Sequence, residues 1–337
     1  MKSSRRIFIR NTALAGIGTG LLGSLRPLYG RSPVQQTNGI RIGIIGLDTS
    51  HAIAFTKSFN NPVTVPGLEG MRVVAAFPQT SPDIELNKKR LPGYIEQVKA
   101  MGVEIVDSMQ MLLDKSDVIL VESNDGRPHL AQAMPAIRAG KKVFIDKPLA
   151  ASLADGIAIV KAAKKYNASI FSSSALRFMD SVKQVKQGAV GKVTGADTFS
   201  PAALEKTHPD LFWYGIHGVE TLFAVMGGGC KTVTRFNTPG SDVVVGQWAD
   251  DRIGTFRGTR NSPDDFGGRV FGEKGNLALG PFKGYEALLQ EIATFFRTGV
   301  APVKPEETLE ILAFMEAAEE SKRKGGKAIA LPNVSNI

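Results

Sequence analysis

The sequence predicts an α/β protein of two domains: a parallel sheet with helices on both faces, then an α+β domain with a mostly antiparallel open sheet. Between residues 40 and 150, short Val/Ile-rich runs alternate with helical patterns, which is typical of βαβ units. From Lys192 onward, short alternating runs are separated by turn residues, which favours antiparallel pairing. A length of 337 residues with 43% hydrophobic residues suits two buried cores.

The same patterns place the elements in order. The first strand and its helix occupy residues 40–59. Further strands of the N-terminal domain are expected at 71–76, 103–106, 118–121, 143–145 and 168–173, with helices at 129–139 and 153–166. C-terminal strands are expected at 193–199, 231–236, 242–248, 253–258 and 268–272, with helices at 284–297 and 306–322. The two domains then span residues 38–174 and 175–337.

The strand that begins at Val143 ends in Asp146-Lys147-Pro148. Ligands of open parallel sheets bind at the carboxyl ends of the strands. A lysine at that place can donate a proton if its surroundings lower its pKa, and Pro148 favours an extended conformation for Lys147. The alternative is an ordinary solvated turn after a strand.

The order of strands and helices, together with Asp146-Lys147-Pro148, resembles the Gfo/Idh/MocA family of nicotinamide-dependent oxidoreductases, which carries Glu-Lys-Pro here. The resemblance covers nearly the whole chain after residue 38. It implies an N-terminal Rossmann dinucleotide-binding domain with NAD or NADP as cofactor. It also implies that Lys147 is catalytic and that Asp146 lies at the cofactor.

The segment after the strand at 118–121 resembles the Thr-Pro-Asn-x-x-His loop of this family, in a longer form. The resemblance implies that Ser123 and Asn124 contact the nicotinamide ribose. Arg127 is either a clamp for substrate or phosphate, or a solvated loop residue. His129 is expected to begin the following helix rather than to take part in chemistry.

The helix around His217 resembles the Asp-x-Gly-x-His helix of the family, which implies that His217 faces Lys147 and polarises the reacting hydroxyl or carbonyl. The alternative is a core histidine. Trp213 replaces the expected acid. Because Asp210 and Glu220 share a helix face with His217, one of them would orient the imidazole instead.

Three further residues are candidates for contact with substrate. Trp213 and Tyr214 would form a stacking wall for a sugar ring. Arg177 follows a segment that resembles a strand end of the family, which implies a place at the domain junction near the cleft. A structural salt bridge from Arg177 to Asp180 is the alternative.

The loop after the first strand departs from the G-x-G-x-x-G fingerprint of dinucleotide folds. Only the first glycine is present, as Gly46, while Asp48 and His51 occupy the second and third positions. A carboxylate repels pyrophosphate, although a protonated His51 would offset it. Asp48, Thr49 or Ser50 would cap a helix whose N–H groups could still face an anion. Cofactor binding by Gly46, Asp48, Thr49, Ser50 and His51 is therefore expected, with a capped, ligand-free helix as the alternative.

The choice between NAD and NADP is open. No acid follows the strand at 71–76 before Asp83, although NAD-binding folds usually place one there for the ribose. The residues that could tolerate a 2′-phosphate instead are Thr80, Ser81, Lys88, Lys89 and Arg90.

Residues 1–30 are interpreted as an export signal, because Ser4-Arg5-Arg6-Ile7-Phe8-Ile9-Arg10 resembles the twin-arginine motif. The apolar stretch that follows is too short for a membrane span. This segment carries five of the nine net positive charges, so the composition does not indicate nucleic-acid binding.

The single cysteine, Cys230, excludes an internal disulfide, and the four histidines show no metal-ligand spacing.

Two classes of function follow. In the first, an exported, periplasmic enzyme uses NAD or NADP to oxidise a sugar or sugar-like polyol. Since the periplasm offers no obvious nicotinamide pool, a bound cofactor would favour a closed redox cycle that ends in glycoside cleavage, elimination or epimerisation. In the second, a relative that has lost its nucleotide binds carbohydrate without turnover. A homo-oligomer is expected by analogy with the family.

Overall fold

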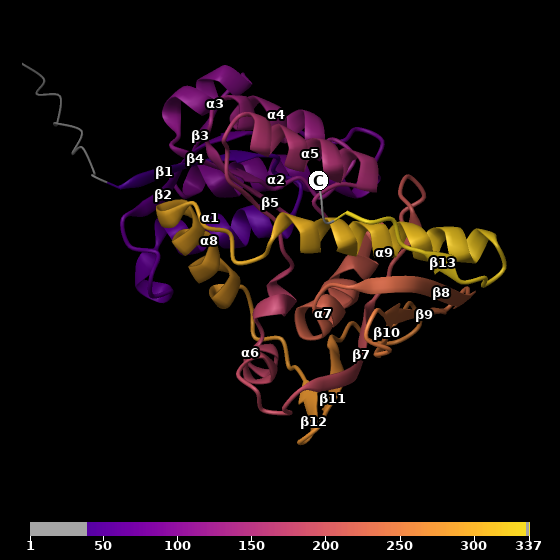
Figure 1. Ribbon diagram of the computed structural model, residues 1–337. Coiled ribbons are helices and arrows are strands. Elements are labelled where there is room, and N and C mark those ends of the chain that lie inside the picture. Colours follow the sequence, from indigo (N-terminus) through magenta and orange to yellow (C-terminus); the bar gives the residue numbers. More distant parts are fainter. Residues whose placement is uncertain (1–38, 335–336) are drawn as a thin grey trace, which may run out of the picture. The chain divides into compact units, whose positions relative to one another are not determined.

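The N-terminal half of the described chain is a six-stranded parallel sheet in the order β3-β2-β1-β4-β5-β6 (Figure 1). The computed structural model describes residues 39–334 and 337, so the twin-arginine segment lies outside the described residues. The strands of this sheet are β1 (Ile40–Ile45), β2 (Met71–Phe77), β3 (Glu104–Ile105), β4 (Val118–Val121), β5 (Lys142–Ile145) and β6 (Ile170–Phe171).

Helices cover both faces of this sheet, which explains why β4 is buried along its whole length. They are α1 (Ser50–Asn60), α2 (Glu85–Ala100), α3 (Met109–Lys115), α4 (His129–Arg138) and α5 (Leu153–Lys165). Of the three residues that the sequence offered as a cap for α1, Thr49 takes the role: its hydroxyl accepts a hydrogen bond from the amide of His51 at 3.2 Å.

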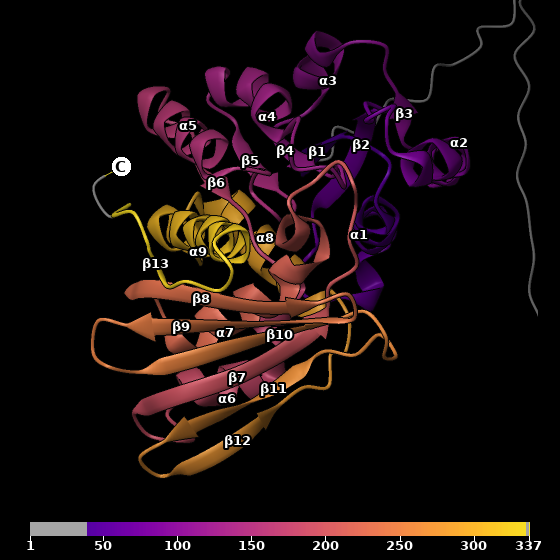
Figure 2. The same ribbon diagram turned by 90° about the vertical axis from the view of Figure 1, so that its right-hand side faces the viewer.

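The C-terminal half contains a seven-stranded sheet in the order β12-β11-β7-β10-β9-β8-β13 (Figure 2). All its neighbouring pairs are antiparallel except β7 and β10. The predicted fold class is thereby confirmed. Its strands are β7 (Val193–Pro201), β8 (Cys230–Thr238), β9 (Ser241–Trp248), β10 (Ile253–Thr259), β11 (Gly267–Gly272), β12 (Gly275–Leu279) and β13 (Ile329–Ala330).

Helix α7 (Ile216–Met226) packs on β7 and β10 and positions His217 at its first turn. A π-helical turn, η3 (Leu211–Gly215), leads into it. The remaining helices are α6 (Asp180–Lys186), α8 (Glu286–Thr298) and α9 (Pro305–Arg323), with short 3₁₀ turns η1 (Pro62–Thr64) and η2 (Ala175–Phe178). Among the described residues, no helix is both long and apolar enough to cross a bilayer.

Helix α8 follows the second sheet in the sequence but packs into the core of the first. Leu288, Leu289 and Ile292 share a buried cluster with Ile42 of β1 and Phe144 of β5. The chain therefore returns to its N-terminal sheet before it enters α9. The loop that leads into α8 is thereby brought to the carboxyl edge of the first sheet.

Helix α2 was not predicted from the sequence. It contains Pro92 in its interior, and Asn87 and Val98 are its buried residues. A helix that buries so little apolar surface has no clear 3.6-residue periodicity, which is why the pattern did not reveal it.

Candidate functional site

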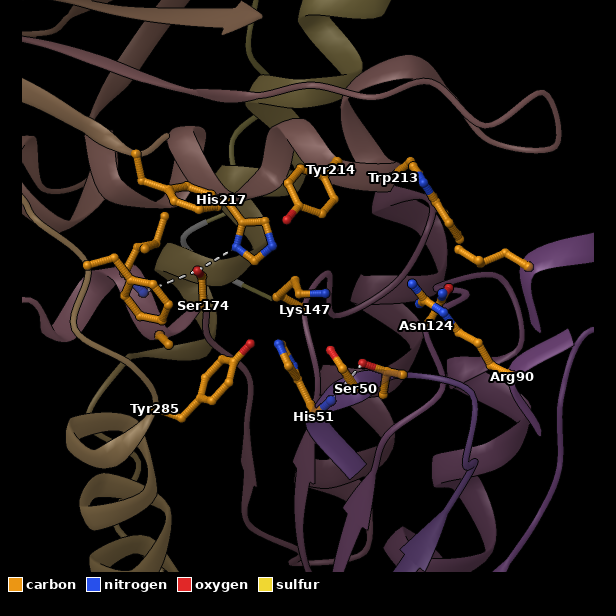
Figure 3. A pocket seen from close by; sticks show the side chains of 16 residues that line it. Ser50, His51, Arg90, Asn124, Lys147, Ser174, Trp213, Tyr214, His217 and Tyr285 are labelled. Carbon is orange, nitrogen blue, oxygen red and sulfur yellow. Dashed lines mark hydrogen bonds between the residues drawn. The ribbon is translucent and has the colours of Figure 1, made fainter. Parts of the chain in front are cut away.

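A cavity of about 280 Å³ lies where the carboxyl ends of β1, β4 and β5 face α7 (Figure 3). Both halves of the chain contribute to it, as expected for a cleft at the edge of a parallel sheet. Its lining residues are Thr49, Ser50, His51, Leu86, Arg90, Asn124, Lys147, Ser174, Ala175, Leu176, Trp213, Tyr214, His217, Phe266, Phe282 and Tyr285.

Lys147 projects into this cavity between the imidazoles of His51 and His217 (Figure 3). Lys147 is only 9% exposed, and its Nζ lies 3.5 Å from Oδ2 of Asp146. The same carboxylate oxygen lies 2.8 Å from Nδ1 of His51. Asp146 therefore lies behind the cavity wall and fixes both Lys147 and His51.

The Asp146 carboxylate is fully buried. Burial acts to raise its pKa, but the nearby charges of His51 and Lys147, with the hydrogen bond from His51, hold the pKa below its usual range. Asp146 is therefore ionised and balances the charge of Lys147.

Glu122, which was not predicted from the sequence to belong to the site, lies beside Asp146. Burial, followed by the negative charge of Asp146, raises the pKa of Glu122 well above its usual value, although Lys147 opposes the shift. Neither carboxyl oxygen of Glu122 has a hydrogen-bond partner in the part of the chain that the structure describes. We therefore take Glu122 as protonated. An acid directly after the apolar run of β4 was the signal that could have revealed it.

The atoms of His51, Glu122 and Asp146 that could bind a metal lie within 4.8 Å of one another. However, the imidazole of His51 and the ammonium of Lys147 already serve as partners of the Asp146 carboxylate. We assign no metal to this cluster.

His217 is 8% exposed, and its Nδ1 lies 2.8 Å from Oγ of Ser174 (Figure 3). Burial, followed by the positive charges of Lys147 and His51, holds the pKa of His217 well below its usual value, so the imidazole is neutral. Ser174 therefore orients the ring through one nitrogen.

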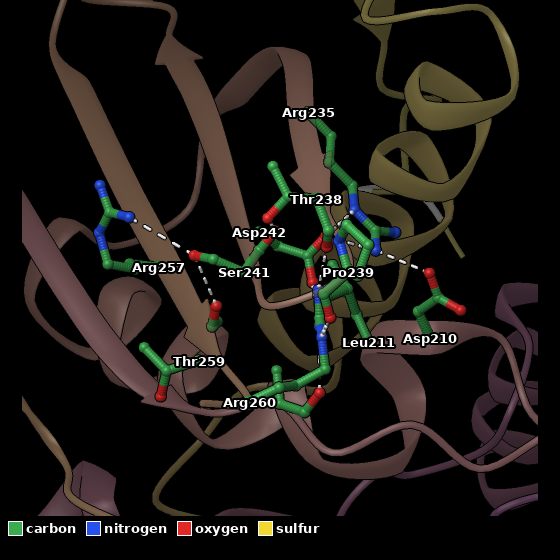
Figure 4. A network of polar contacts seen from close by, with 12 residues as sticks. Asp210, Leu211, Arg235, Thr238, Pro239, Ser241, Asp242, Arg257, Thr259 and Arg260 are labelled. Carbon is green, nitrogen blue, oxygen red and sulfur yellow. Dashed lines mark hydrogen bonds and ion pairs between the residues drawn. The ribbon is translucent and has the colours of Figure 1, made fainter. Parts of the chain in front are cut away.

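The expectation that Asp210 or Glu220 orients His217 is wrong. Asp210 accepts a hydrogen bond from Arg235 at 2.7 Å, within the network shown in Figure 4. Glu220 accepts one from Arg177 at 2.8 Å. A shared helix face did not bring either acid to the imidazole, because each one pairs with an arginine from another element.

Arg177 lies outside the cavity lining. Its guanidinium is 3% exposed and donates to Glu220 and, at 2.6 Å, to Glu307 of α9. The alternative salt bridge to Asp180 does not form either, since Asp180 pairs with Lys283. Arg177 thus ties the segment after β6 to two helices of the C-terminal half.

Aromatic rings surround Lys147 and His217 in the cavity. Trp213 and Tyr214 line the cavity, as the sequence led us to expect. Tyr285, from the loop before α8, was missed; its ring centroid lies 4.8 Å from that of His51. Burial, then the charge of Asp146, raises the pKa of Tyr285 to about 12, while a hydrogen bond with Ser50 lowers it. The hydroxyl of Tyr285 is therefore protonated at neutral pH.

Gly46 occupies the end of the first strand with φ +86°, a conformation that favours glycine. A Cβ at Gly46 would also lie 2.4 Å from Oγ of Ser123. Glycine is therefore required here for contact with the loop after β4, whether or not a pyrophosphate is bound.

Asp48 does not project as a free charge into the crevice. It is fully buried, and it accepts hydrogen bonds from the Thr80 hydroxyl at 2.6 Å, the Asn87 amide at 3.0 Å and the backbone N–H of Asn124 at 2.8 Å. Burial raises its pKa, although the bonds from Thr80 and Asn124 oppose that shift. The repulsion expected between Asp48 and a pyrophosphate is thus reduced, because three hydrogen bonds neutralise part of the charge of the carboxylate.

The loop after β4 is anchored in the same way. Arg127 pairs with Asp83 at 2.8 Å and with Asp125 at 2.7 Å, so it is neither a free clamp nor a solvated residue. Ser81 donates to Asp125 at 2.5 Å. His129 begins α4, as expected, and its Nε2 lies 3.0 Å from the carbonyl oxygen of Ser123.

The described residues fit the nicotinamide end of a dinucleotide. Oγ of Ser123 and Oδ1 of Asn124 are buried and have no hydrogen-bond partner among the described residues. Both lie at the end of β4, where a ribose would need polar contacts, but only Asn124 lines the cavity, because Oγ of Ser123 packs against Gly46. At the pyrophosphate end, Asn87 contacts Asp48 directly, so a dinucleotide in the ordinary Rossmann position requires residues 80–87 to move away.

The comparisons with known proteins agree with this architecture. Residues 40–173 match the family model described as an oxidoreductase family with an NAD-binding Rossmann fold. An uncharacterized oxidoreductase of Streptococcus pneumoniae is 24% identical over 179 residues, which are 48% of each chain. The matched segment thus spans about half the length of that curated relative.

Solved structures share the fold. Scyllo-inositol dehydrogenase of Lactobacillus casei, with NAD(H) and scyllo-inositol bound, is 18% identical with a TM-score of 0.71, over 87% of this chain and 99% of that one. Myo-inositol 2-dehydrogenase of Lactobacillus plantarum gives the same identity and TM-score, over 87% and 100%. A probable dehydrogenase of Thermotoga maritima is 19% identical with a TM-score of 0.70, over 86% and 98%.

At these identities the solved structures establish the fold alone, whereas the family model identifies the domain that carries Lys147. Residues 40–173, which include Lys147, match the model of the Gfo/Idh/MocA oxidoreductase family with its NAD-binding Rossmann fold.

Proposed function

We propose that this protein is an NAD(P)-dependent oxidoreductase that oxidises a CH–OH group of a sugar or sugar-like polyol. The observation that carries the proposal is that Lys147, from the first sheet, and His217, from α7, line one small cavity. The similar inositol dehydrogenases support a polyol as the substrate class.

Within the cavity, Lys147 first releases a proton from its ammonium to water, and its neutral Nζ then accepts a hydrogen bond from the substrate hydroxyl and takes that proton as the carbon is oxidised. Asp146 keeps the amine in place, since its carboxylate lies 3.5 Å from Nζ. His217 is neutral, and its Nδ1 is held by Ser174, so its Nε2 is available to the substrate oxygen. Trp213 and Tyr214 pack against the ring of the substrate.

A bound nicotinamide supplies the two-electron acceptor for this reaction. Ser123 and Asn124 hold its ribose, and Thr49 and Ser50 present the N-terminus of α1 to the phosphates. These residues serve NAD and NADP equally. The choice between the two is decided elsewhere, at the end of β2.

We further propose export by the twin-arginine route to the periplasm, with the cofactor carried along and regenerated in each turnover. The motif at Arg5 and Arg6 supports export. The twin-arginine route also supports retention, because it exports folded proteins and so allows the cofactor to be bound before the protein leaves the cytoplasm. Cell fractionation of the Arg5→Lys, Arg6→Lys double variant tests export. If the motif directs export, the double variant stays in the cytoplasm.

The main experiment determines which nucleotide is bound and how turnover changes when the Lys147 amine is removed. Protein purified from the periplasm is denatured and its released nucleotides are identified by mass spectrometry; we expect NAD(H) or NADP(H). Lys147→Ala is expected to lower kcat by about 10²–10⁴-fold and to leave nucleotide content unchanged. Lys161→Ala, at an exposed position of α5, is the control. Normal turnover in Lys147→Ala contradicts the mechanism.

A second candidate is a carbohydrate-binding relative without turnover, favoured by the contact between Asp48 and Asn87 where a pyrophosphate would lie. It predicts no co-purified nucleotide and no thermal shift with NAD or NADP, but a thermal shift with a polyol. The oxidoreductase predicts shifts with both ligands.

We also propose that the protein forms a homo-oligomer through the C-terminal sheet. One face of this sheet packs on α7, and the other exposes apolar side chains such as Ile253, 50% exposed, and Phe271, 39% exposed. A second copy of the chain would cover them. Light scattering tests this, and a monomer with Ile253→Lys would identify the interface.

A further inference from the structure

We propose that the substrate of this site carries a carboxylate group, as in a sugar acid, and that Arg90 binds it. This inference rests on the proposed function, because it names the class of polyol that the same cavity accepts. The hydroxyl to be oxidised lies at Lys147 and His217, and the carboxylate lies at the opposite end of the cavity.

Arg90 differs from the other arginines around the site. It lines the cavity and is partly buried, yet it forms no hydrogen bond or ion pair with any described residue. Arg127 and Arg177, by contrast, each pair with two carboxylates. A partly desolvated guanidinium without a partner is a ready binding group for a planar anion, since its N–H groups match a carboxylate bidentately.

The charges around the cavity leave Arg90 uncompensated. No aspartate or glutamate is among the lining residues. Of the buried acids behind the cavity wall, Asp146 is matched by Lys147, and Asp48 accepts hydrogen bonds from Thr80, Asn87 and Asn124. Asp264 acts on Tyr214 from an exposed loop but does not line the cavity. An incoming carboxylate therefore meets a net positive wall with no acid to repel it.

The position of Arg90 is set by helix α2. Asn87, one turn earlier in α2, is fully buried and hydrogen-bonded to Asp48, which holds the first turns of α2 against the sheet. In Figure 3, Arg90 and Asn124 lie on one side of Lys147, and His217 and Tyr285 lie on the other. A ligand with a hydroxyl at one end and an anion at the other spans this arrangement.

The volume limits the size of such a ligand. A cavity of about 280 Å³ is slightly below the usual range for small-molecule sites, and the cofactor-binding residues Thr49, Ser50 and Asn124 share its lining, which favours a single sugar unit over an oligosaccharide. The aromatic side chains of Trp213 and Tyr214 supply the apolar wall for its ring.

The test compares matched ligands on matched variants. D-glucuronate and D-galacturonate are titrated by calorimetry into the purified protein, beside the neutral D-glucose and D-galactose and the anionic D-glucose 6-phosphate. The variants are Arg90→Met and, as control, Lys89→Met, the exposed neighbour outside the cavity lining. We expect each uronate to bind at least about tenfold more tightly than its neutral sugar, and Arg90→Met but not Lys89→Met to abolish the difference.

Three results overturn the inference. One is equal binding of acids and neutral sugars by the unmodified protein. Another is preference for the sugar phosphate over both uronates. The third is a loss of NAD or NADP binding in Arg90→Met with unchanged uronate affinity, which would assign Arg90 to a cofactor phosphate.

Because these titrations need no turnover, they separate this inference from the proposed function. Arg90-dependent binding of uronate by a protein that lacks nucleotide and activity supports the inference and removes the oxidoreductase. Nucleotide-dependent oxidation of neutral polyols that is unaffected in Arg90→Met supports the oxidoreductase and removes the inference.

Discussion

The amide Nδ2 of Asn87 donates a hydrogen bond of 3.0 Å to Oδ2 of Asp48, joining helix α2 to the loop that follows the first strand. Both residues are fully buried. In dinucleotide folds this loop approaches the pyrophosphate, and small residues normally leave the space free. Here Asp48 stands at the second glycine position and contacts Thr80 and Asn87, so we expect cofactor entry to depend on residues 80–87.

This dependence can be tested by removing the donor. Asn87→Ala leaves Asp48 with one hydrogen bond fewer and should lower the free energy of unfolding by about 1–3 kcal/mol. It should also speed the exchange of bound nucleotide, because residues 80–87 open more easily. Exchange is measured by displacement with a fluorescent NAD analogue, and Lys99→Ala, at an exposed position in the last turn of α2, serves as the control. Unchanged exchange in a folded Asn87→Ala variant would show that this contact does not control entry.

Glu122 should make the protein less stable as the pH rises. Its pKa in the folded state is well above the usual value because of burial and the charge of Asp146. Between the usual pKa and the folded pKa, the folded state keeps a proton that the unfolded state releases. The free energy of unfolding therefore falls with pH in that window, by up to about 1.4 kcal/mol per pH unit.

Glu122→Gln removes this dependence while it keeps the shape of the side chain. We expect the variant to have a higher Tm than the unmodified protein at pH 7, and the difference to vanish below the usual carboxyl pKa. Thermal unfolding across this pH range is the measurement. A Tm difference that does not change with pH would mean that Glu122 is ionised in the folded state.

Ser174→Ala tests the hydrogen bond that orients His217. The loss of one neutral hydrogen bond, worth about 0.5–1.5 kcal/mol, should lower kcat by up to about tenfold and change KM little. Ser174 also accepts a hydrogen bond from the Leu176 amide at 3.3 Å, so a loss of stability is expected as well. Ser108→Ala, which removes the cap of α3 far from the cavity, is the matched control. Equal kcat in both variants would contradict an orienting role for Ser174.

The sequence was sufficient for the fold class and for expecting Lys147 and His217 at one cavity. The strand pattern is carried by local runs of apolar residues, and both residues lie in segments that resemble family motifs. The side chains that complete the site were less accessible. Ser174 reaches His217 across 43 positions of sequence, and Tyr285 comes from a loop without periodicity.

Polar residues were the main source of error. Asp48, Arg177 and Glu220 all look reactive in the sequence, because charged residues near a strand end or on a helix face are often exposed to ligands. In the structure each one is buried with partners from distant segments. Such pairing depends on tertiary packing, which no local pattern encodes. Arg90 is a different case: the sequence offered it with Lys88 and Lys89 as a residue that could tolerate a 2′-phosphate, and in the structure only Arg90 of these three lines the cavity.

Arg177 offers the final test, since the resemblance placed it near the substrate and the structure places it in an ion-pair network. Arg177→Met leaves Glu220, only 5% exposed, without its ion-pair partner and with only the hydrogen bond from the Ser173 hydroxyl. The free energy of unfolding should fall by about 3–5 kcal/mol, and the double variant with Glu220→Gln should recover part of the loss because the uncompensated charge is gone. Binding of a sugar ligand should not change in either folded variant. Lys183→Met, at an exposed position of α6, is the control for the substitution itself. A stable Arg177→Met variant that no longer binds sugar would instead assign Arg177 to the substrate.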